Sequence, residues 1–222
     1  MSATISEQSA QLKAVAAERL PGEVLAAFDR SVADLLETGI PADAVKPGDQ
    51  VESFTLADAT GNLVSLDELV AAAPAVIVFY RGGWCPYCNV ALRTYQRELL
   101  PELNASGARL VAISPQTPDE SLSTTEKAEL AFTVLSDPGS RVAQSLGIAF
   151  RQPDEALAAQ RTLGIDLATV NAEGSVNLPR PTVLIVDQNR TARFVDIQPD
   201  YTARTEVADI LTALADLGAD QS

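Results

Sequence analysis

The sequence predicts an α/β fold in which helices flank a central mixed sheet, with a helical extension in front of it. The first observation is the unbroken apolar run 75–80, which ends near a glycine pair as a strand buried on both faces does. The runs 109–113 and 133–135 also read as strands, and helical segments separate them, which implies parallel pairing with right-handed crossovers. The runs 183–186 and 192–197 flank a short turn and form a hairpin, which makes the sheet mixed.

The first part of the chain, residues 1–45, reads as a helical extension in front of a main domain over 46–222. Thr4 and Glu7 have the spacing of a capping box, and a second amphipathic helix is expected to end at Gly39. Its apolar face would pack either on the main domain or on a second subunit. A homodimer is therefore one of two expectations for this chain.

The main domain opens with a hairpin, and the helices that follow carry recognisable start and stop signals. Thr117-Pro118-Asp119-Glu120 combines a capping threonine, a proline at the first helical position and a glutamate three residues on. The other expected elements are a hairpin over 51–66 that turns at 59–62, a short helix over 66–72, a long helix after 88 bent at Pro101, a helix through Val142 and Leu146, and a final helix over 207–217.

Residues 148–178 interrupt this alternation as an insertion. The segment 153–163 looks helical and ends at Gly164, and 171–177 is rich in turn residues. A segment of this length serves either as a cap over the active site or as an ordinary surface excursion. The sequence does not choose between the two.

Composition excludes several classes of function. The chain has 222 residues and a formal net charge of −14, which argues against nucleic acid as a partner. The longest apolar stretch, 69–80, is too short to cross a membrane and contains Pro74. Residues 1–11 are polar, unlike a signal peptide, so we expect a cytoplasmic protein. In a reducing cytosol a disulfide would be transient and functional.

The chain has two cysteines, Cys85 and Cys88, and both fall at a strand-to-helix junction. Pro86 between them suits the first turn of a helix, where unpaired N–H groups and the positive end of the helix dipole favour a thiolate. Spaced in this way, the pair can cycle between dithiol and disulfide. A coincidental pair of buried thiols is the less favoured alternative. Structural zinc needs four ligands, mostly Cys and His, and the chain has no His, so we expect neither metal nor cofactor.

Two resemblances meet at this motif. The run 84–88, Trp-Cys-Pro-Tyr-Cys, resembles the thioredoxin active site, and the preceding Val78-Phe79-Tyr80-Arg81 is similar to the peroxiredoxin-like branch of the alkyl hydroperoxide reductase and thiol-specific antioxidant family. On that family's pattern Arg81 stands where a proline is usual and Cys85 where a threonine is usual. Cys88 then stands at the position of the cysteine that attacks peroxide.

The resemblance implies a thioredoxin-like fold over 46–217 and extends to a second stretch, 178–187. Pro181-Thr182 before a strand resembles the cis-proline segment of thioredoxins, so we expect a cis bond before Pro181. Arg180 lies close to where peroxiredoxins carry the arginine that contacts the reactive cysteine; the alternative is an arginine of a surface loop. The resemblance thus assigns catalysis to Cys88, Cys85 and Arg180, with five residues that shape the site: Tyr80, Arg81, Trp84, Pro181 and Thr182.

These assignments imply a thiol-dependent peroxidase that reduces hydrogen peroxide or organic hydroperoxides, with a thioredoxin-like or low-molecular-weight thiol as reductant. The alternatives are a thioredoxin-type protein disulfide oxidoreductase and a redox-switched binding protein without turnover. The thioredoxin and the peroxiredoxin resemblance assign the attack to different sulfurs. We expect Cys88 to attack peroxide and Cys85 to attack protein disulfides. The family arginine would favour the thiolate by its charge.

Overall fold

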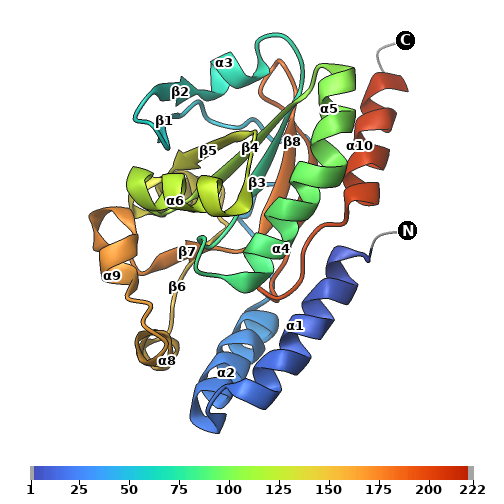
Figure 1. Cartoon of the computed structure of the whole chain (residues 1–222). Coiled ribbons are helices and arrows are strands. Elements are labelled where there is room, and N and C mark those ends of the chain that lie inside the picture. Colours follow the sequence, from blue (N-terminus) through green and yellow to red (C-terminus); the bar gives the residue numbers. More distant parts are fainter. Residues whose placement is uncertain (1–2, 220–222) are drawn as a thin grey trace.

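The computed structural model describes residues 3–219, and seven strands form one mixed sheet at its centre (Figure 1). The strand order is β2-β1-β5-β4-β3-β8-β9. The bounds are β1 (Thr55–Asp58), β2 (Leu63–Ser65), β3 (Ala75–Phe79), β4 (Arg109–Ser114), β5 (Thr133–Ser136), β8 (Thr182–Val186) and β9 (Ala192–Ile197). A separate two-stranded sheet joins β6 (Ala149–Arg151) and β7 (Asn177–Pro179).

The helices lie on both faces of this sheet. They are α1 (Ile5–Arg19), α2 (Gly22–Thr38), α3 (Leu66–Val70), α4 (Pro86–Thr94), α5 (Leu100–Ser106), α6 (Pro118–Ala128), α7 (Arg141–Ser145), α8 (Asp154–Thr162), α9 (Leu167–Val170) and α10 (Val207–Ala219). Short 3-10 turns cover Pro138–Ser140 and Ala172–Gly174. None of the helices in the described part of the chain is long and apolar enough to span a bilayer.

Strand β3 lies inside the sheet between β4 and β8, and it runs parallel to β4 and antiparallel to β8. Ile77 is opposite Val111 on one side and Leu184 on the other. Strands β4 and β5 are also parallel. The α/β fold with a mixed sheet is confirmed, as is the parallel pairing expected from the alternation of strands and helices.

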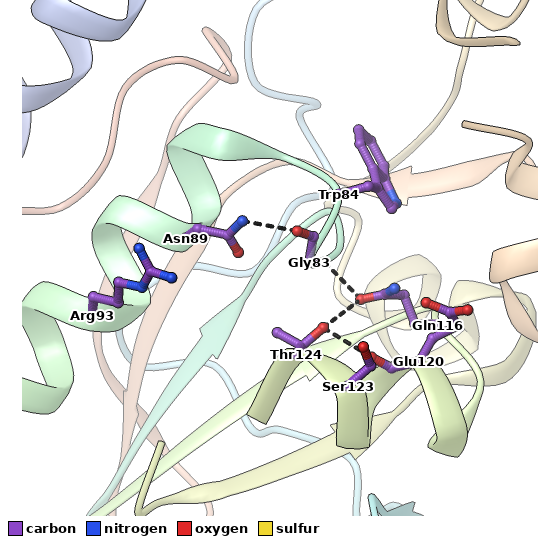
Figure 2. Close-up of a pocket in the computed structure, with 8 residues that line it drawn as sticks. All are labelled: Gly83, Trp84, Asn89, Arg93, Gln116, Glu120, Ser123 and Thr124. Atoms are coloured by element: carbon purple, nitrogen blue, oxygen red, sulfur yellow. Dashed lines mark hydrogen bonds between the residues drawn. The ribbon is translucent and has the colours of Figure 1, made fainter. Parts of the chain in front are cut away.

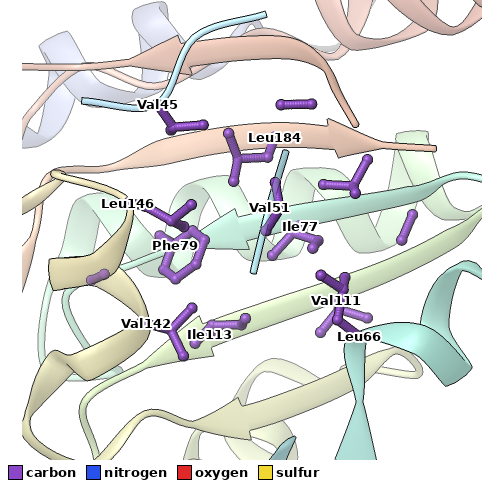
Figure 3. Close-up of a cluster of buried hydrophobic side chains, with 14 of the residues drawn as sticks. Val45, Val51, Leu66, Ile77, Phe79, Val111, Ile113, Val142, Leu146 and Leu184 are labelled. Atoms are coloured by element: carbon purple, nitrogen blue, oxygen red, sulfur yellow. The ribbon is translucent and has the colours of Figure 1, made fainter. Parts of the chain in front are cut away.

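Alternate side chains of the central strands supply two separate apolar layers. Val76 and Val78 face the layer that holds both cysteines, α4 and Ile210 of α10. Ile77 and Phe79 face the opposite layer, which packs against α3 and α7 (Figure 3). The cysteine pair therefore sits in a packed apolar layer, shortly after a strand that is buried on both faces.

The helix after the cysteines continues through a π-helical turn, Tyr95–Leu99, into α5. Proline lacks a backbone N–H, and its ring clashes with the preceding turn of an α-helix. Pro101 stands in the first turn of α5, directly after the wider π turn. The structure thus has a π turn just before Pro101, and the bend expected at Pro101 itself stays a prediction.

The N-terminal helices α1 and α2 lie where the sequence predicts them. Thr4 and Glu7 form the capping box, and α2 ends at Gly39, whose φ is +67°. Helix α1 packs against α4, while α2 packs against α8 (Figure 1). These helices thus pack on the main domain of the same chain. The division at residue 45 and the homodimer stay predictions.

The insertion 148–178 contains more structure than the sequence indicates. Its helix α8 matches the expected segment, but β6 and β7 form a ribbon that sequence reasoning missed. Each of these strands has three residues, too short to show the alternating pattern of a strand. Ala149 pairs with Pro179, so the ribbon leads directly to Arg180.

We expect Leu184→Ala to lower the free energy of unfolding by about 2–5 kcal/mol, because it leaves a cavity beside β8 in the apolar layer that also holds Ile77 and Phe79. Leu63, which is 71% exposed on the edge strand β2, provides the matched control. Leu63→Ala should change stability by about 0.5 kcal/mol or less. Chemical denaturation measures both variants, and equal losses would contradict this account of the core.

Candidate active site

Cys85 and Cys88 occupy the first turn of α4, directly after the central strand β3. Cys85 is the N-cap residue, Pro86 follows it, and Cys88 lies on the first turn. The two residues are 1% and 0% exposed. The strand fixes where the turn begins, and the positive end of the α4 dipole lies at this turn.

The two glycines between strand and helix let other parts of the chain come close. A Cβ on Gly82, whose φ is +148°, would overlap the indole ring of Trp84. A Cβ on Gly83 would overlap the side chain of Thr124 on α6. The Gly83 N–H donates to Gln116 Oε1 at 2.7 Å (Figure 2). The turn is therefore packed closely against Trp84, Thr124 and Gln116.

A third contact fixes the turn to its own helix. Asn89 on α4 donates from Nδ2 to the Gly83 carbonyl oxygen at 2.8 Å, as Figure 2 shows. Thr124 Oγ1 adds a longer bond to Gln116 Oε1, at 3.4 Å. These contacts hold the segment that carries the cysteines before any reaction begins, which is the preorganisation that an active site requires.

Arg204, in the loop between β9 and α10, is the cation beside the sulfurs. Its Nη2 atom lies 2.9 Å from Cys88 Sγ and 3.9 Å from Cys85 Sγ. The structure thus brings a guanidinium to the cysteine pair, as the peroxiredoxin resemblance implies, but from a different residue. Sequence reasoning missed Arg204 because it lies in a loop without a motif, more than a hundred residues beyond the cysteines.

The charge of the pair is concentrated on Cys88. Burial alone would raise the pKa of Cys88, but a hydrogen bond from Cys85 and the positive charges of Arg204 and Arg81 lower it well below its ordinary value. The hydrogen bond to Cys88 is also the main reason that the pKa of Cys85 is raised, with burial second. These directions favour a thiolate at Cys88 and a thiol at Cys85.

Neighbouring residues of the same loop hold Arg204 in place. Tyr95, in the π turn, donates its hydroxyl to the Thr205 carbonyl oxygen at 2.6 Å. Thr205 Oγ1 donates to Asp196 Oδ2 at 2.7 Å, and Arg204 Nη1 donates to the Tyr201 carbonyl oxygen at 2.6 Å. Tyr95 is therefore a positioning residue, which acts on the sulfurs only through the loop that carries Arg204.

Arg81 is buried beside the pair and is held by aromatic rings. Its guanidinium carbon lies 4.0 Å from the ring centre of Tyr201 and 5.1 Å from that of Trp84. Its Nη2 donates to Gln152 Oε1 at 3.4 Å, and Gln152 in turn donates to Gln160 Oε1 at 3.0 Å. Both glutamines belong to the insertion, which thus supports the site from one side.

Arg180 is buried, but its contacts lie elsewhere. Its Nη1 donates to the Ala149 carbonyl oxygen at 3.3 Å, and its guanidinium carbon is 5.6 Å from the ring centre of Phe150. Within the described part of the chain, Arg180 donates no hydrogen bond to either sulfur. Arg204 occupies the place beside the thiols that was expected for Arg180. A role of Arg180 in the chemistry stays a prediction.

The expected cis bond before Pro181 is wrong, since the described residues contain no cis peptide. Pro181 lies between β7 and β8, and its carbonyl oxygen accepts a hydrogen bond from Gln198 N at 2.8 Å. Thr182 is buried at the start of β8 and donates its hydroxyl to the Arg180 carbonyl oxygen at 2.9 Å. Tyr80, the fifth shaping residue, is buried in the same layer as the cysteines, and burial raises its pKa.

The residues around the pair offer no site for a metal ion. Among the residues that the structure describes, no three or more Cys, Asp or Glu side chains gather in a way that could hold one.

Replacing Arg204 by methionine should raise the pKa of the Cys88 thiol, because the nearest positive charge is lost. A close opposite charge shifts a pKa by roughly 1–3 units. Because only the thiolate reacts, the alkylation rate of the variant should decline as the pH falls from about 8 to about 6, where wild type holds its rate. The pH dependence of iodoacetamide alkylation measures this shift.

Arg180→Met is the matched control for that experiment. Its guanidinium contacts Ala149 and Phe150, so we expect a smaller rise in the thiol pKa than from Arg204→Met. A larger rise from Arg180→Met would show that the charge arrangement described above is wrong.

Comparison with known proteins places this geometry in a family. A family model described as AhpC/TSA family matches residues 47–195. The chloroplastic peroxiredoxin Q of Sedum lineare is 31% identical over 121 residues, which cover 54% of this chain and 63% of that protein. The chloroplastic peroxiredoxin Q of Populus jackii is 31% identical over 104 residues, covering 47% of this chain and 48% of that protein.

Solved structures agree on the fold. The crystal structure of peroxidoxin BcpB from Mycobacterium tuberculosis matches with a TM-score of 0.61 at 24% identity, over 80% of this chain and 99% of that one. The chain spans 63% or less of the length of these two curated relatives. The family match covers most of the chain, including both cysteines and their strand, and the chain belongs to the AhpC/TSA family.

Proposed function

We propose that this protein is a thiol peroxidase that reduces hydroperoxides through Cys88 and Cys85. The observation that carries the proposal is the 2.9 Å contact between Arg204 Nη2 and Cys88 Sγ. A thiolate held by a guanidinium at a helix N-terminus is the nucleophile that peroxide reduction requires. The family match and the likeness to peroxiredoxin Q support the same reaction class.

The proposed reaction begins with attack by the Cys88 thiolate on the terminal oxygen of ROOH. An S–O bond forms and the O–O bond breaks, so the sulfur loses two electrons and becomes a sulfenic acid. The leaving alkoxide takes a proton from water and departs as ROH. The Cys85 thiol then condenses with the sulfenic acid, which forms a disulfide and releases water.

The chain's own groups serve each step. Arg204 keeps Cys88 ionised and stabilises the negative charge that develops on the breaking O–O bond. The site needs no separate base for the attack, because the nucleophile is already ionised. The hydrogen bond between the two sulfurs keeps Cys85 close enough to resolve the sulfenic acid.

An external thiol then returns the pair to its reduced form. Two electrons from a dithiol, or from two monothiols, cleave the Cys85–Cys88 disulfide and leave the donor oxidised. A thioredoxin-like protein and a low-molecular-weight thiol both supply these electrons. A reducing cytoplasm, the compartment expected from the sequence, suits this cycle.

A second candidate, a thioredoxin-type disulfide oxidoreductase, has one observation in its favour. Cys85 lines a cavity at the surface, whereas Cys88 does not, so an incoming disulfide would meet Cys85 first. In that reaction Cys85 would need to be the thiolate. The proximity of Arg204 to Cys88 disfavours this assignment.

The two candidates predict opposite results for single serine variants treated with one equivalent of hydroperoxide. On our account Cys85→Ser still forms a sulfenic acid, because Cys88 keeps its thiolate and loses only its resolving partner. Cys88→Ser should react more slowly by about tenfold or more, because the remaining sulfur, Cys85 Sγ, lies farther from the Arg204 guanidinium and only the thiolate attacks. Dimedone labelling followed by mass spectrometry locates the modified sulfur.

Wild type provides the control, since it should gain an intramolecular disulfide instead of a dimedone adduct. If only Cys88→Ser forms the adduct, then Cys85 is the attacking residue and the oxidoreductase assignment replaces ours.

A further inference from the structure

Three consecutive residues of the loop before α10 make contacts with three different parts of the protein. Arg204 donates from Nη2 to Cys88 Sγ at 2.9 Å. Thr205 accepts a hydrogen bond from Tyr95 at its carbonyl oxygen, and the Glu206 carboxylate accepts hydrogen bonds from the first two residues of α1. One short segment thus joins the cysteine pair to the N-terminal helix.

The contact at Glu206 satisfies the start of α1. Ile5 N donates to Glu206 Oε2 at 3.0 Å, and Ser6 N donates to Oε1 at 2.8 Å. The first N–H groups of a helix have no partner within the helix and carry the positive end of its dipole, so a carboxylate there stabilises the helix. In Figure 1 the first turn of α1 lies close to the start of α10, which follows Glu206. The place of α1 therefore depends on the position of the loop.

The position of the loop depends in turn on the charge of Cys88. Apart from the sulfurs, Arg204 donates to backbone carbonyl oxygens, those of Tyr201 and Ala203. In the described part of the chain its Nε atom is buried without a hydrogen-bond partner, and no carboxylate forms an ion pair with it. The Cys88 thiolate is therefore the anion that compensates this guanidinium.

Formation of the disulfide removes this anion. The Cys88 thiolate and the Cys85 thiol together lose two electrons and one proton when the S–S bond forms, and the oxidant takes up both electrons. Both sulfurs are then neutral, and the Arg204 guanidinium loses the negative charge beside it. A buried charge left without its partner is unfavourable, so oxidation favours a position of the loop in which the guanidinium reaches water.

We propose that oxidation of the cysteine pair loosens α1 through this loop, with Glu206 as the positioning residue that links the helix to Arg204. The inference rests on the proposed function for its oxidant, and it involves helices outside the family match, which begins at residue 47. Helices α1 and α2 line a cavity that Cys85 also lines. A loosened α1 therefore exposes the disulfide to the external thiol, and reduction returns α1 to its place.

The first test measures hydrogen–deuterium exchange of wild type in the reduced form and after oxidation with diamide, which forms the disulfide without peroxide. Exchange of the α1 amides should be about tenfold faster or more in the oxidised form, a factor typical of coupled sites. The amides of α3, which packs on the opposite face of the sheet, are the internal control and should keep their rates. Equal α1 rates in the two forms, or an equal acceleration of α1 and α3, would overturn the proposal.

The second test uses Glu206→Gln, which removes the carboxylate charge and one of its two acceptor oxygens. Because coupling acts in both directions, a docked α1 must favour the reduced pair as strongly as the reduced pair favours docking. Loss of a tenfold coupling should therefore lower the reduction potential of the pair by about 30 mV, measured in glutathione redox buffers. Asp209→Asn is the matched control, since it removes the same charge from an exposed residue of α10 and should leave the potential unchanged.

A reduction potential that is equal in wild type and Glu206→Gln would also overturn the proposal. So would equal downward shifts in Glu206→Gln and Asp209→Asn, because the loss of charge alone would then explain them. None of these outcomes affects the peroxidase assignment, since diamide and glutathione act on the pair without peroxide. If hydroperoxides fail to oxidise the pair while both tests give the expected results, the proposed function fails and the coupling of α1 to the cysteine pair stands.

Discussion

The contact between the Arg204 guanidinium and Cys88 Sγ, 2.9 Å long, is the interaction on which the chemistry of this structure depends. A buried thiolate without a partner would take up a proton, because charge is poorly solvated in the protein interior. Arg204 and the Cys85 thiol together replace the water that such a charge loses on burial. The consequence is a reactive sulfur inside a packed layer, next to the thiol that can trap its oxidised form.

The fold positions this contact from elements that are distant in sequence. Strand β3 ends beside the cysteines, the glycine pair admits Trp84 and Thr124, and α4 begins at Cys85. Arg204 lies in the loop that follows β9, the second strand of the last hairpin. Tyr95, in the π turn, holds this loop by donating a hydrogen bond to the Thr205 carbonyl oxygen. Helix irregularities of this kind often occur at functional sites. Here the π turn places a tyrosine hydroxyl against the loop that carries the guanidinium.

Much of the architecture could be predicted from the sequence, because local signals encode it. The apolar run before the cysteines, the capping threonines and the helix-ending Gly39 each specify their own element. The site was predictable only where the motif is contiguous, at 84–88. Arg204 could not be identified, because its role depends on how a long loop returns to α4. The expectation for Arg180 followed a family position, whereas its side chain in this chain packs on Phe150.

The insertion and the N-terminal helices illustrate the same limit. The sequence predicts helices in both segments, but what these helices contribute to the site depends on tertiary contacts. Gln152 accepts a hydrogen bond from Arg81, and α1 and α2 line a cavity that Cys85 also lines. Both segments thus add residues around the cysteine pair, while the pair itself stays on the β3–α4 junction. A chain with the same motif and other flanking helices would present the same sulfurs to a different set of molecules.

The most direct test of the central claim is a double-mutant cycle on stability with Cys88→Ser and Arg204→Met, measured by chemical denaturation under reducing conditions. Cys88 has a lower pKa folded than unfolded, so the pair stabilises the protein above the unfolded thiol pKa of about 8.5 and less as the pH falls through the folded pKa. The account predicts a coupling energy on the order of 1–4 kcal/mol at about pH 9, which disappears in acid. A coupling near zero at about pH 9, or one independent of pH, would contradict it.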